Sequence, residues 1–448
     1  MKKVDSCQLS VVSTMMAAIL ATGGLVMAAS LEAPAVQTQP LRVLELDQAL
    51  QIAVDQNRDI QKALQYRKQV EGIYMQERAA ALPEFTLHLS GWREGDESQK
   101  VFGGGIFPLE RDMRIAEVSL SQTLFSWGKV GAAIRAAKVG LATADDQLRI
   151  FKQAAIHDVS SAFYDVLLAK ELHELAVQDH DQKVRHLDEA RRKYTAGVAT
   201  DYDVLAAEVT VQNARPEVIR TENQIKVARE RLRFLLAVDD TEVDCTGTLD
   251  SPIADYPTYD VMLPLALERR PDLSDQRHRV GVYHELVKIA NADDKPRIDL
   301  RGAYGWREMK FGSIHGDGRA WSAGLYLTFP FFDGMRTRGA VTRARADLAT
   351  AEIDEAKLRD SIALEVRDAV NAVRQAGEIV KALSGTVAQA ERLLQMAEKG
   401  YEYGAMTRLE VEDAETNVVQ AKGNLSIAQR GYLVALAGLG RATGTLGE

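Results

Sequence analysis

Tyr194-Thr-Ala-Gly197-Val-Ala-Thr200 is the stretch that organises this chain, because a matching stretch, Tyr401-Glu-Tyr-Gly404-Ala-Met-Thr407, follows 207 residues later (401 − 194). The match continues at the same offset through Asp203-Val204 and Glu410-Val411. A repeat has to be recognised before single elements are assigned, since it constrains all of them. The two stretches indicate an internal duplication.

Upstream segments match in a second register. Ala53 to Ile60 corresponds to Ala266 to Leu273, an offset of 213 residues (266 − 53). A hairpin loop of different length in each half, near Gly103 to Gly105 and near Gly312 to Gly318, explains the change of register.

Each half contains two segments in which apolar and polar residues alternate. Period two over about ten residues predicts strands, at the length that a tilted transmembrane β-strand needs. The expected strands lie at about residues 84–93, 115–125, 297–306 and 319–331. A soluble antiparallel sheet shows the same alternation, so the pattern alone leaves membrane insertion open.

Long helices follow the expected strands. From Val130 to Ala155 the apolar positions alternate steps of four and three, which is typical of helices packed at shallow angles. No proline lies between Val130 and Gly197, or in the matching stretch up to Gly404, so each helix can reach ~100 Å. We expect long helices at about 129–196 and 337–400, tips at 197–200 and 404–407, and return helices at about 202–237, with a break at Pro216, and 409–438.

The N-terminus reads as a secretory signal peptide over residues 1–29. Lys2 and Lys3 precede an apolar run from Val11 to Met27, and small residues follow it. The alternative is a membrane anchor, which the short run and its central glycines disfavour. Beyond this segment the expected divisions are repeat 1 at 42–238, a proline-rich linker at 239–263, repeat 2 at 264–440 and a tail at 441–448.

Stability of the mature chain has to come from packing or oligomerisation. Only Cys245 remains after cleavage, so no intramolecular disulfide can form. No later segment is long and apolar enough to cross a bilayer as a helix, so a membrane crossing has to use strands of a closed barrel; otherwise the product is soluble and periplasmic. The alanine-rich helical seams leave apolar surface uncovered, which favours an oligomer.

The composition argues against nucleic-acid binding and against catalysis. The formal net charge is −9, and a basic patch is the usual mark of a nucleic-acid partner. His173 and His180 lack metalloprotease spacing, and neither a serine elbow nor a phosphate loop is present. We expect no enzyme activity, no cofactor and no metal site.

Several motifs in order and in duplicate resemble the TolC-type outer membrane efflux proteins over nearly the whole mature length. They are Ala53 to Ile60 and Ala266 to Leu273, the strand openings Leu82 to Leu87 and Lys295 to Leu300, Phe329-Pro-Phe-Phe-Asp-Gly334, and the tip pattern Tyr-x-x-Gly-x-x-Thr. The resemblance implies a mixed α and β fold, mostly helical, with two internal repeats. It implies a homotrimer sharing one transmembrane β-barrel, four strands per protomer, continued by a long α-helical barrel in the periplasm, with the 239–263 linker in an equatorial region.

The function implied by the resemblance is that of an outer-membrane channel, the exit duct of a tripartite efflux or secretion system. Its implied partners are a periplasmic adaptor (membrane fusion) protein, an inner-membrane RND or ABC pump, and outer-membrane lipid. The cargo and the pump type stay open. The alternative is a periplasmic coiled-coil adaptor or scaffold of an export system, which shares the signal and the helical hairpins.

The resemblance also implies roles for residues near the tips. Glu410 and Asp413, spaced i and i+3, match pore-constriction carboxylates, with a solvated helix face as the alternative. Asp203 and Tyr401 match closed-state gate contacts, while Met406 stands where a closing arginine is often found. The tips expected to contact the adaptor are Gly197, Val198, Thr200, Gly404, Ala405 and Thr407.

Overall fold

The computed structural model describes residues 41–95, 110–238, 242–253, 258–312 and 314–447. The expected signal peptide and the stretch Gly103 to Gly105 lie outside these residues. The elements of the unit Leu41–Glu448 are β1 (Leu41–Leu44), α1 (Leu46–Gln56), α2 (Arg58–Ala79), β2 (Glu84–Gly95), β3 (Glu110–Phe125), α3 (Lys129–Thr195), α4 (Asp201–Leu236), β4 (Glu242–Cys245), α5 (Tyr259–Arg269), α6 (Pro271–Asn291), β5 (Arg297–Phe311), β6 (Ile314–Thr328), α7 (Arg336–Glu402) and α8 (Arg408–Thr443).

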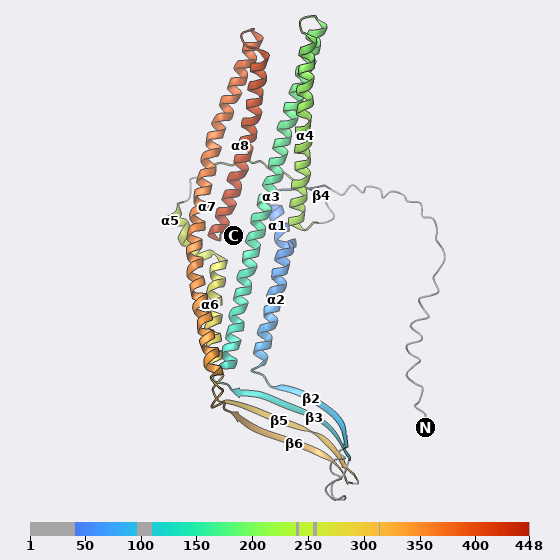
Figure 1. The fold of residues 1–448 in the computed structure, drawn as a ribbon, viewed down its shortest axis with the longest axis vertical. Coiled ribbons are helices and arrows are strands. Elements are labelled where there is room, and N and C mark those ends of the chain that lie inside the picture. The colour runs from blue at the N-terminus through green and yellow to red at the C-terminus, as the bar shows by residue number, and fades with distance from the viewer. Residues whose placement is uncertain (1–40, 96–109, 239–241, 254–257, 313, 448) are drawn as a thin grey trace, which may run out of the picture. The chain divides into compact units, whose positions relative to one another are not determined.

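Two long helical hairpins dominate the unit (Figure 1). Helices α3 and α7 contain 67 residues each, so each is about 100 Å long at 1.5 Å per residue. Each pairs with its return helix, α4 or α8. The residue just before each long helix adopts a left-handed backbone conformation: Gly128 before α3 and Met335 before α7. Neither long helix contains a proline.

The expected break at Pro216 is wrong. Helix α4 runs without interruption from Asp201 to Leu236 with Pro216 inside it. A proline in a helix interior costs about 3 kcal/mol because it lacks a backbone N–H and crowds the preceding turn. Packing of α4 along α3 outweighs this local cost, and local sequence does not reveal that packing.

At the other end of the helices from the tips, four antiparallel strands form one sheet in the order β2-β3-β5-β6. The strands differ from expectation at their ends: β5 continues to Phe311 and β6 begins at Ile314, so the turn between them is tight. Strand β6 ends at Thr328 and not near residue 331, where the alternation placed its end. Pro330 explains the earlier end, because proline has no N–H to donate to a strand ladder.

In the half of the sheet nearest the helices, the register gathers most of the large apolar side chains of the four strands on one face. Phe85 pairs with Leu120, Leu87 with Val118, Val118 with Tyr304, and Tyr304 with Trp321, and directly opposed residues point to the same side. The face comprises Phe85, Leu87, Leu89, Ala116, Val118, Leu120, Tyr304, Trp306, Trp321, Ala323, Leu325 and Leu327. Leu89 is 71% exposed and Trp321 76%, so within one chain this apolar face is uncovered.

The opposite face of the sheet is polar and internally bonded. Arg307 donates to Glu117 at 3.0 Å, the Arg301 guanidinium lies 5.1 Å from the centroid of the Tyr326 ring, and the Thr123 hydroxyl donates to a carboxylate oxygen of Asp299 at 3.0 Å. Near the helices the sheet therefore has one lipophilic and one hydrophilic side, whereas toward the turns Trp92, Met113 and Met309 lie side by side on the second face.

Between the sheet and the tips, short elements pack against the middle of the long helices. Strand β1 pairs in parallel with β4, and a core around Leu44, Val159, Phe163, Leu232 and Leu249 joins α1, α3 and α4. A second core, whose buried members include Leu273, Ile362, Val366, Val373 and Tyr432, joins α5 to α8. Thus the linker expected at 239–263 contains β4 and the start of α5. Among the described helices, none has the length and apolarity needed to cross a membrane.

Candidate functional site

The first tip is a tight turn closed at both ends by hydrogen bonds. Backbone N–H groups of Gly197 and Val198 donate to the carbonyls of Tyr194 and Lys193, both at 2.9 Å. Gly197 has φ +75°, a conformation that favours glycine because it has no Cβ.

Helix α4 then begins with a reciprocal cap. The Thr200 N–H and hydroxyl both donate to the Asp203 carboxylate at 2.7 Å, and the Asp203 N–H donates back to the Thr200 hydroxyl at 3.3 Å. These bonds to Thr200 hold the pKa of Asp203 below its usual value. The cap satisfies backbone donors that a helix start otherwise leaves unpaired.

The second tip has the same construction. Gly404 has φ +72°, and Thr407 and Glu410 form the reciprocal cap of α8, with the Thr407 N–H 2.6 Å from the carboxylate. Hydrogen bonds from Thr407 hold the pKa of Glu410 below its usual value. Asp413 is exposed one turn further along the same side of α8. The two expected constriction carboxylates therefore lie close together beyond the tip.

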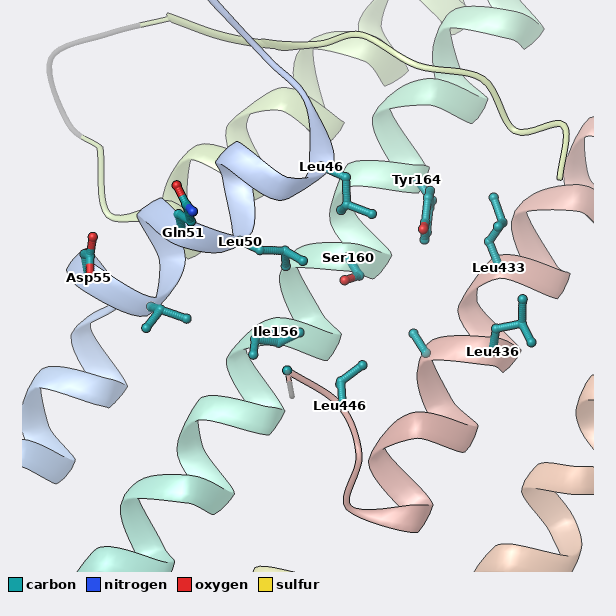
Figure 2. Close-up of a pocket in the computed structure, with 13 residues that line it drawn as sticks. Leu46, Leu50, Gln51, Asp55, Ile156, Ser160, Tyr164, Leu433, Leu436 and Leu446 are labelled. Carbon is teal, nitrogen blue, oxygen red and sulfur yellow. The ribbon is translucent and has the colours of Figure 1, made fainter. Parts of the chain in front are cut away.

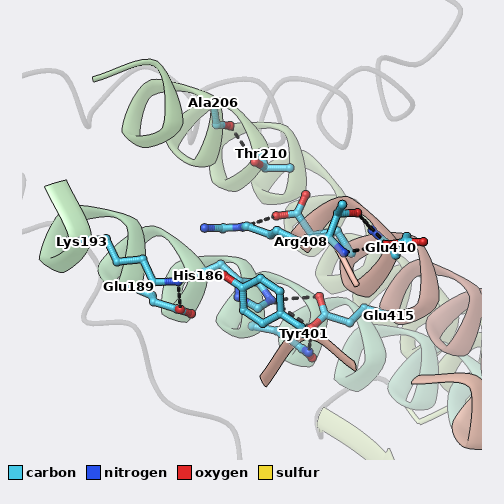
Figure 3. A network of polar contacts seen from close by, with 12 residues as sticks. His186, Glu189, Lys193, Ala206, Thr210, Tyr401, Arg408, Glu410 and Glu415 are labelled. Carbon is cyan, nitrogen blue, oxygen red and sulfur yellow. Dashed lines mark hydrogen bonds and ion pairs between the residues drawn. The ribbon is translucent and has the colours of Figure 1, made fainter. Parts of the chain in front are cut away.

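A buried carboxylate joins the two hairpins just below the tips (Figure 3). Glu415 of α8 is 9% exposed, and its two oxygens lie 2.9 and 3.0 Å from Nε2 of His186 in α3. The side-chain amide of Gln182 also donates to Glu415. A carboxylate removed from water needs such partners, so the three residues act as one polar joint.

Closer to the tips, Lys193 of α3 reaches Tyr401 of α7. Its ammonium donates to the Tyr401 hydroxyl at 2.8 Å and lies 5.1 Å from the ring centroid. The same ammonium lies 2.7 Å from Glu189, and the bonds to Glu189 and Tyr401 raise the pKa of Lys193. Within one chain, Tyr401 therefore contacts Lys193, and Asp203 is engaged by Thr200 instead.

Met406 fills the inside of the second tip. It packs with Ala397, Val411 and Ala414, and a Cβ added to Gly400 would lie 2.8 Å from its Cγ. The nearby Arg408 donates to Glu412 at 2.8 Å along α8. Met406 is thus part of the apolar packing of the tip, and the arginine two residues later bonds within its own helix.

The joint residues His186, Gln182 and Glu415 and the contact residue Lys193 were not singled out from the sequence. One signal was available for Glu415: it lies beside Val411, Ala414 and Val418, which form the packed face of α8. An acid on such a face needs a partner, but the repeat gives no hint that the partner lies on α3.

Two cavities lie between the helices of the described residues. A cavity of about 200 Å³ between α3, α4 and α8 is lined by Lys183, His186, Arg408, Glu412 and Asp413, among others. A larger one, about 740 Å³, lies between α1, α3 and α8, where Leu50, Ile156, Leu433 and Leu446 form apolar walls (Figure 2). Within the described part of the chain, no group of three or more His, Cys, Asp or Glu could hold a metal ion.

Comparison with known proteins places these features in a family. The model of the outer membrane efflux protein family matches residues 49–238 and 262–445. The chain is 24% identical over 389 residues to outer membrane protein TolC of Vibrio cholerae, covering 83% of this chain and 84% of that protein. It is 26% identical over 411 residues to the alkaline protease secretion protein AprF of Pseudomonas aeruginosa, covering 89% and 84%.

Solved structures share the fold. The CmeC outer membrane channel of Campylobacter jejuni superposes with a TM-score of 0.78 at 17% identity, covering 89% of this chain and 85% of that one. The open state of the MtrE outer membrane channel of Neisseria gonorrhoeae gives 0.76 at 21% identity, covering 89% and 88%. With the family model spanning both halves of the sequence, this chain belongs to the outer membrane efflux protein family.

Proposed function

We propose that this protein is the outer-membrane channel of an export system and conducts substrate passively through a trimer. The observation that carries the proposal is the sheet, whose four strands present one continuous apolar face to the outside of the chain. Strands that cross a bilayer alternate lipid-facing and lumen-facing residues in this way. The polar face then lines an aqueous lumen.

The open edges of the sheet support assembly from several chains. In the described part of the chain, β2 and β6 each pair with one strand only. Unpaired backbone groups are not tolerated in lipid, and a closed barrel removes them. Three copies of a four-stranded sheet close a barrel of about twelve strands, a number within the range known for membrane barrels.

The helical hairpins continue the conduit into the periplasm. In this assembly Glu410 and Asp413 of three copies form two acidic rings at the far end, which attract cations. The gate contacts proposed for Asp203 and Tyr401 are then between chains, since inside one chain these residues bond to Thr200 and Lys193.

The tips are the proposed docking points for a periplasmic adaptor, which links the channel to an inner-membrane pump. Gly197, Thr200, Gly404, Ala405 and Thr407 shape the two turns, and exposed apolar side chains surround them. These are Val198 (75%), Tyr202 (77%), Tyr403 (86%) and Leu409 (65%). Exposed apolar groups on a turn that a rigid hairpin holds in place suit contact with a partner protein.

Recordings of single channels in planar bilayers test the proposal. Wild-type protein purified from outer membranes as a trimer is expected to open cation-selective pores. The double variant Glu410→Gln with Asp413→Asn should lower cation selectivity, whereas Glu412→Gln should leave it unchanged because that carboxylate is already paired with Arg408 of the same helix. A monomer in mild detergent, or protein that leaves bilayers sealed, contradicts the channel.

The alternative of a periplasmic adaptor accounts for the hairpins but not for the sheet. A soluble protein that exposes Leu87, Leu325, Leu327 and Trp321 on one face would aggregate. Recovery of the protein in the soluble periplasmic fraction would favour that alternative.

A further inference from the structure

The junction between β6 and α7 carries a band of exposed apolar side chains. Phe329 is 55% exposed, Phe331 87%, Phe332 77% and Met335 65%. By the alternation of β6, Phe329 continues the apolar face that includes Leu325 and Leu327. Aromatic residues at the end of a lipid-facing surface favour the boundary between hydrocarbon and headgroups.

Four exposed arginines, Arg336, Arg338, Arg343 and Arg345, follow this band in the first three turns of α7. In the described residues, the side chains of Arg338, Arg343 and Arg345 form no hydrogen bond or ion pair. The pKa of Asp333 is held below its usual value mainly by hydrogen bonds from Thr337, and the charge of nearby Arg336 contributes less. Within the part of the chain that the structure describes, the charge of Arg338, Arg343 and Arg345 is therefore not neutralised by a direct partner.

The corresponding junction of the first half is different. There Lys129 lies 2.5 Å from Asp293 and Arg135 lies 2.8 Å from Glu285. Both carboxylates belong to α6 or the turn after it. Lys138, 207 residues before Arg345, is exposed and forms no hydrogen bond or ion pair with the described residues, so the first junction pairs two of its three cations internally and the unpaired cations are more numerous on α7.

The direction of each arginine follows from the sheet and the helix hand. Gly312 donates its N–H to the Glu110 carbonyl of β3, so even-numbered residues of β5 direct their backbone N–H and C=O groups toward β3. Odd-numbered residues, which carry the polar-face side chains such as Asp299, direct theirs toward β6. For L-residues this puts β6 to the left of β5 when the apolar face is viewed with the β5–β6 turn at the top. The helices follow the strands in the same order, and α7 lies beside α6 (Figure 1, where the sheet is at the bottom). With the turn at the top and the apolar face toward the viewer, α7 is therefore to the left of α6.

Helix α7 runs downward in this view and contacts α6 through Ala351 and Glu355. With about 100° between successive residues of a right-handed helix, Arg338 and Arg345, seven residues apart, face the viewer on the side of the apolar face. The other two arginines face the opposite side, toward the lumen of the proposed channel.

We propose that Arg338 and Arg345, together with the aromatic band before them, bind phosphate groups of anionic phospholipids in the periplasmic leaflet of the outer membrane. This inference rests on the proposed function, because it requires the sheet to span that membrane. Guanidinium groups match phosphate oxygens in a two-pronged geometry, and cations at a membrane surface gain from its anionic lipids. Binding of lipid phosphates by Arg338, Arg345 and the aromatic band would hold the channel at a fixed depth in the membrane, at the level where the strands join the helices.

Tryptophan energy transfer to labelled lipid in reconstituted vesicles tests the proposal. The protein is placed in phosphatidylcholine vesicles that contain a trace of dansyl-labelled phosphatidylglycerol or, separately, dansyl-labelled phosphatidylcholine. The wild type should favour the anionic probe. Arg338→Gln with Arg345→Gln should lower this preference by about fivefold or more, whereas the matched pair Arg336→Gln with Arg343→Gln should leave it within about twofold.

Two further readings separate the possible failures. Ion conductance of the same vesicles reports the channel itself, so sealed vesicles with wild-type protein count against the proposed function. If the vesicles conduct but the two double variants show the same preference for the anionic probe, the proposed lipid binding by Arg338 and Arg345 is wrong. Replacing chloride by inorganic phosphate at equal ionic strength should leave the preference unchanged; its loss would assign the arginines to free phosphate and also overturn the proposal.

Discussion

The Nε2 atom of His186 lies 2.9 Å from one oxygen and 3.0 Å from the other oxygen of the buried Glu415 carboxylate, which ties the first hairpin to the second. Replacing Glu415 with Ala leaves His186 and Gln182 without their acceptor at this half-buried contact. We expect the local free energy of opening to fall by about 1 to 3 kcal/mol, measured by hydrogen exchange of amides near both residues.

The first half provides a matched control for this prediction. Glu208 occupies the position 207 residues before Glu415, is exposed, and lies 3.8 Å from Arg191. Glu208→Ala should change exchange by less than about 0.5 kcal/mol, since surface pairs contribute little. Equal effects at Glu208 and Glu415 would show that the buried joint has no special role.

A double-mutant cycle tests whether His186 and Glu415 act together. Each single change leaves the other side chain without its partner, so His186→Ala combined with Glu415→Ala should cost clearly less stability than the sum of the single changes. Thermal melting of the detergent-solubilised protein can supply the four values. Strict additivity would mean that the two side chains contribute independently.

The caps at the tips should weaken in acid. Asp203 and Glu410 have a pKa below the usual value because Thr200 and Thr407 bond to their charged forms. A lowered pKa in the folded state gives stability that is present above the ordinary carboxylate pKa and is lost as the pH falls through the folded-state value. Exchange of the tip amides, compared at matched intrinsic rates, should therefore stay constant at neutral pH and rise below about pH 4.

Removal of the threonine hydroxyl should reduce that pH dependence at one tip. Thr407→Ala is expected to loosen the start of α8 by about 1 kcal/mol and to make its acid response smaller but not absent, because the backbone N–H of residue 407, the larger cause of the lowered Glu410 pKa, still donates to that carboxylate. The Thr200 tip should keep its full response, and an acid response of unchanged size in Thr407→Ala would show that the hydroxyl contributes nothing to it.

Two glycines of the second hairpin should respond in opposite directions to alanine. Gly404 has φ +72°, so Gly404→Ala should destabilise the tip by about 1 to 2 kcal/mol. Gly385 lies inside α7 with no heavy atom near its added Cβ, so Gly385→Ala should stabilise by about 0.5 to 1 kcal/mol. Melting temperatures distinguish the two, and a loss of stability at Gly385 would reveal a neighbour from another chain.

Cys245 should be unreactive in the folded protein. Burial raises the pKa of its thiol to about 12, so the nucleophilic thiolate is scarce at any ordinary pH. Labelling with a maleimide at pH 8 should be slow in native protein and fast in denaturant. Rapid native labelling would mean that the core around β4 opens readily.

The sequence supported the family, the outer-membrane location and the mostly helical fold because each depends on patterns that extend over many residues. Comparison with the family model confirms the recognition. Element ends were less predictable, as at Phe311 and Thr328, because pairing with a neighbouring strand decides them. Pro216 was misjudged because packing of α4 on α3 outweighs a local preference.

The site divides along the same line. Gly197, Gly404 and the two caps follow from local rules, so they could be located from the sequence. The His186 and Glu415 joint depends on residues more than two hundred positions apart, and no pattern within either helix contains that information. The roles of Glu410, Asp413, Asp203 and Tyr401 depend on neighbouring chains, and they stay predictions.

Helices α3 and α7 have the same number of residues, and so do α4 and α8, at 36 each. The equal lengths constrain which insertions and deletions the two hairpins can tolerate. Losing seven residues from one long helix shortens it by about 10 Å, so the adaptor proposed to dock at the tips would meet the two tips at different heights. Length changes in one half are therefore expected to be tolerated only when the other half changes by the same amount.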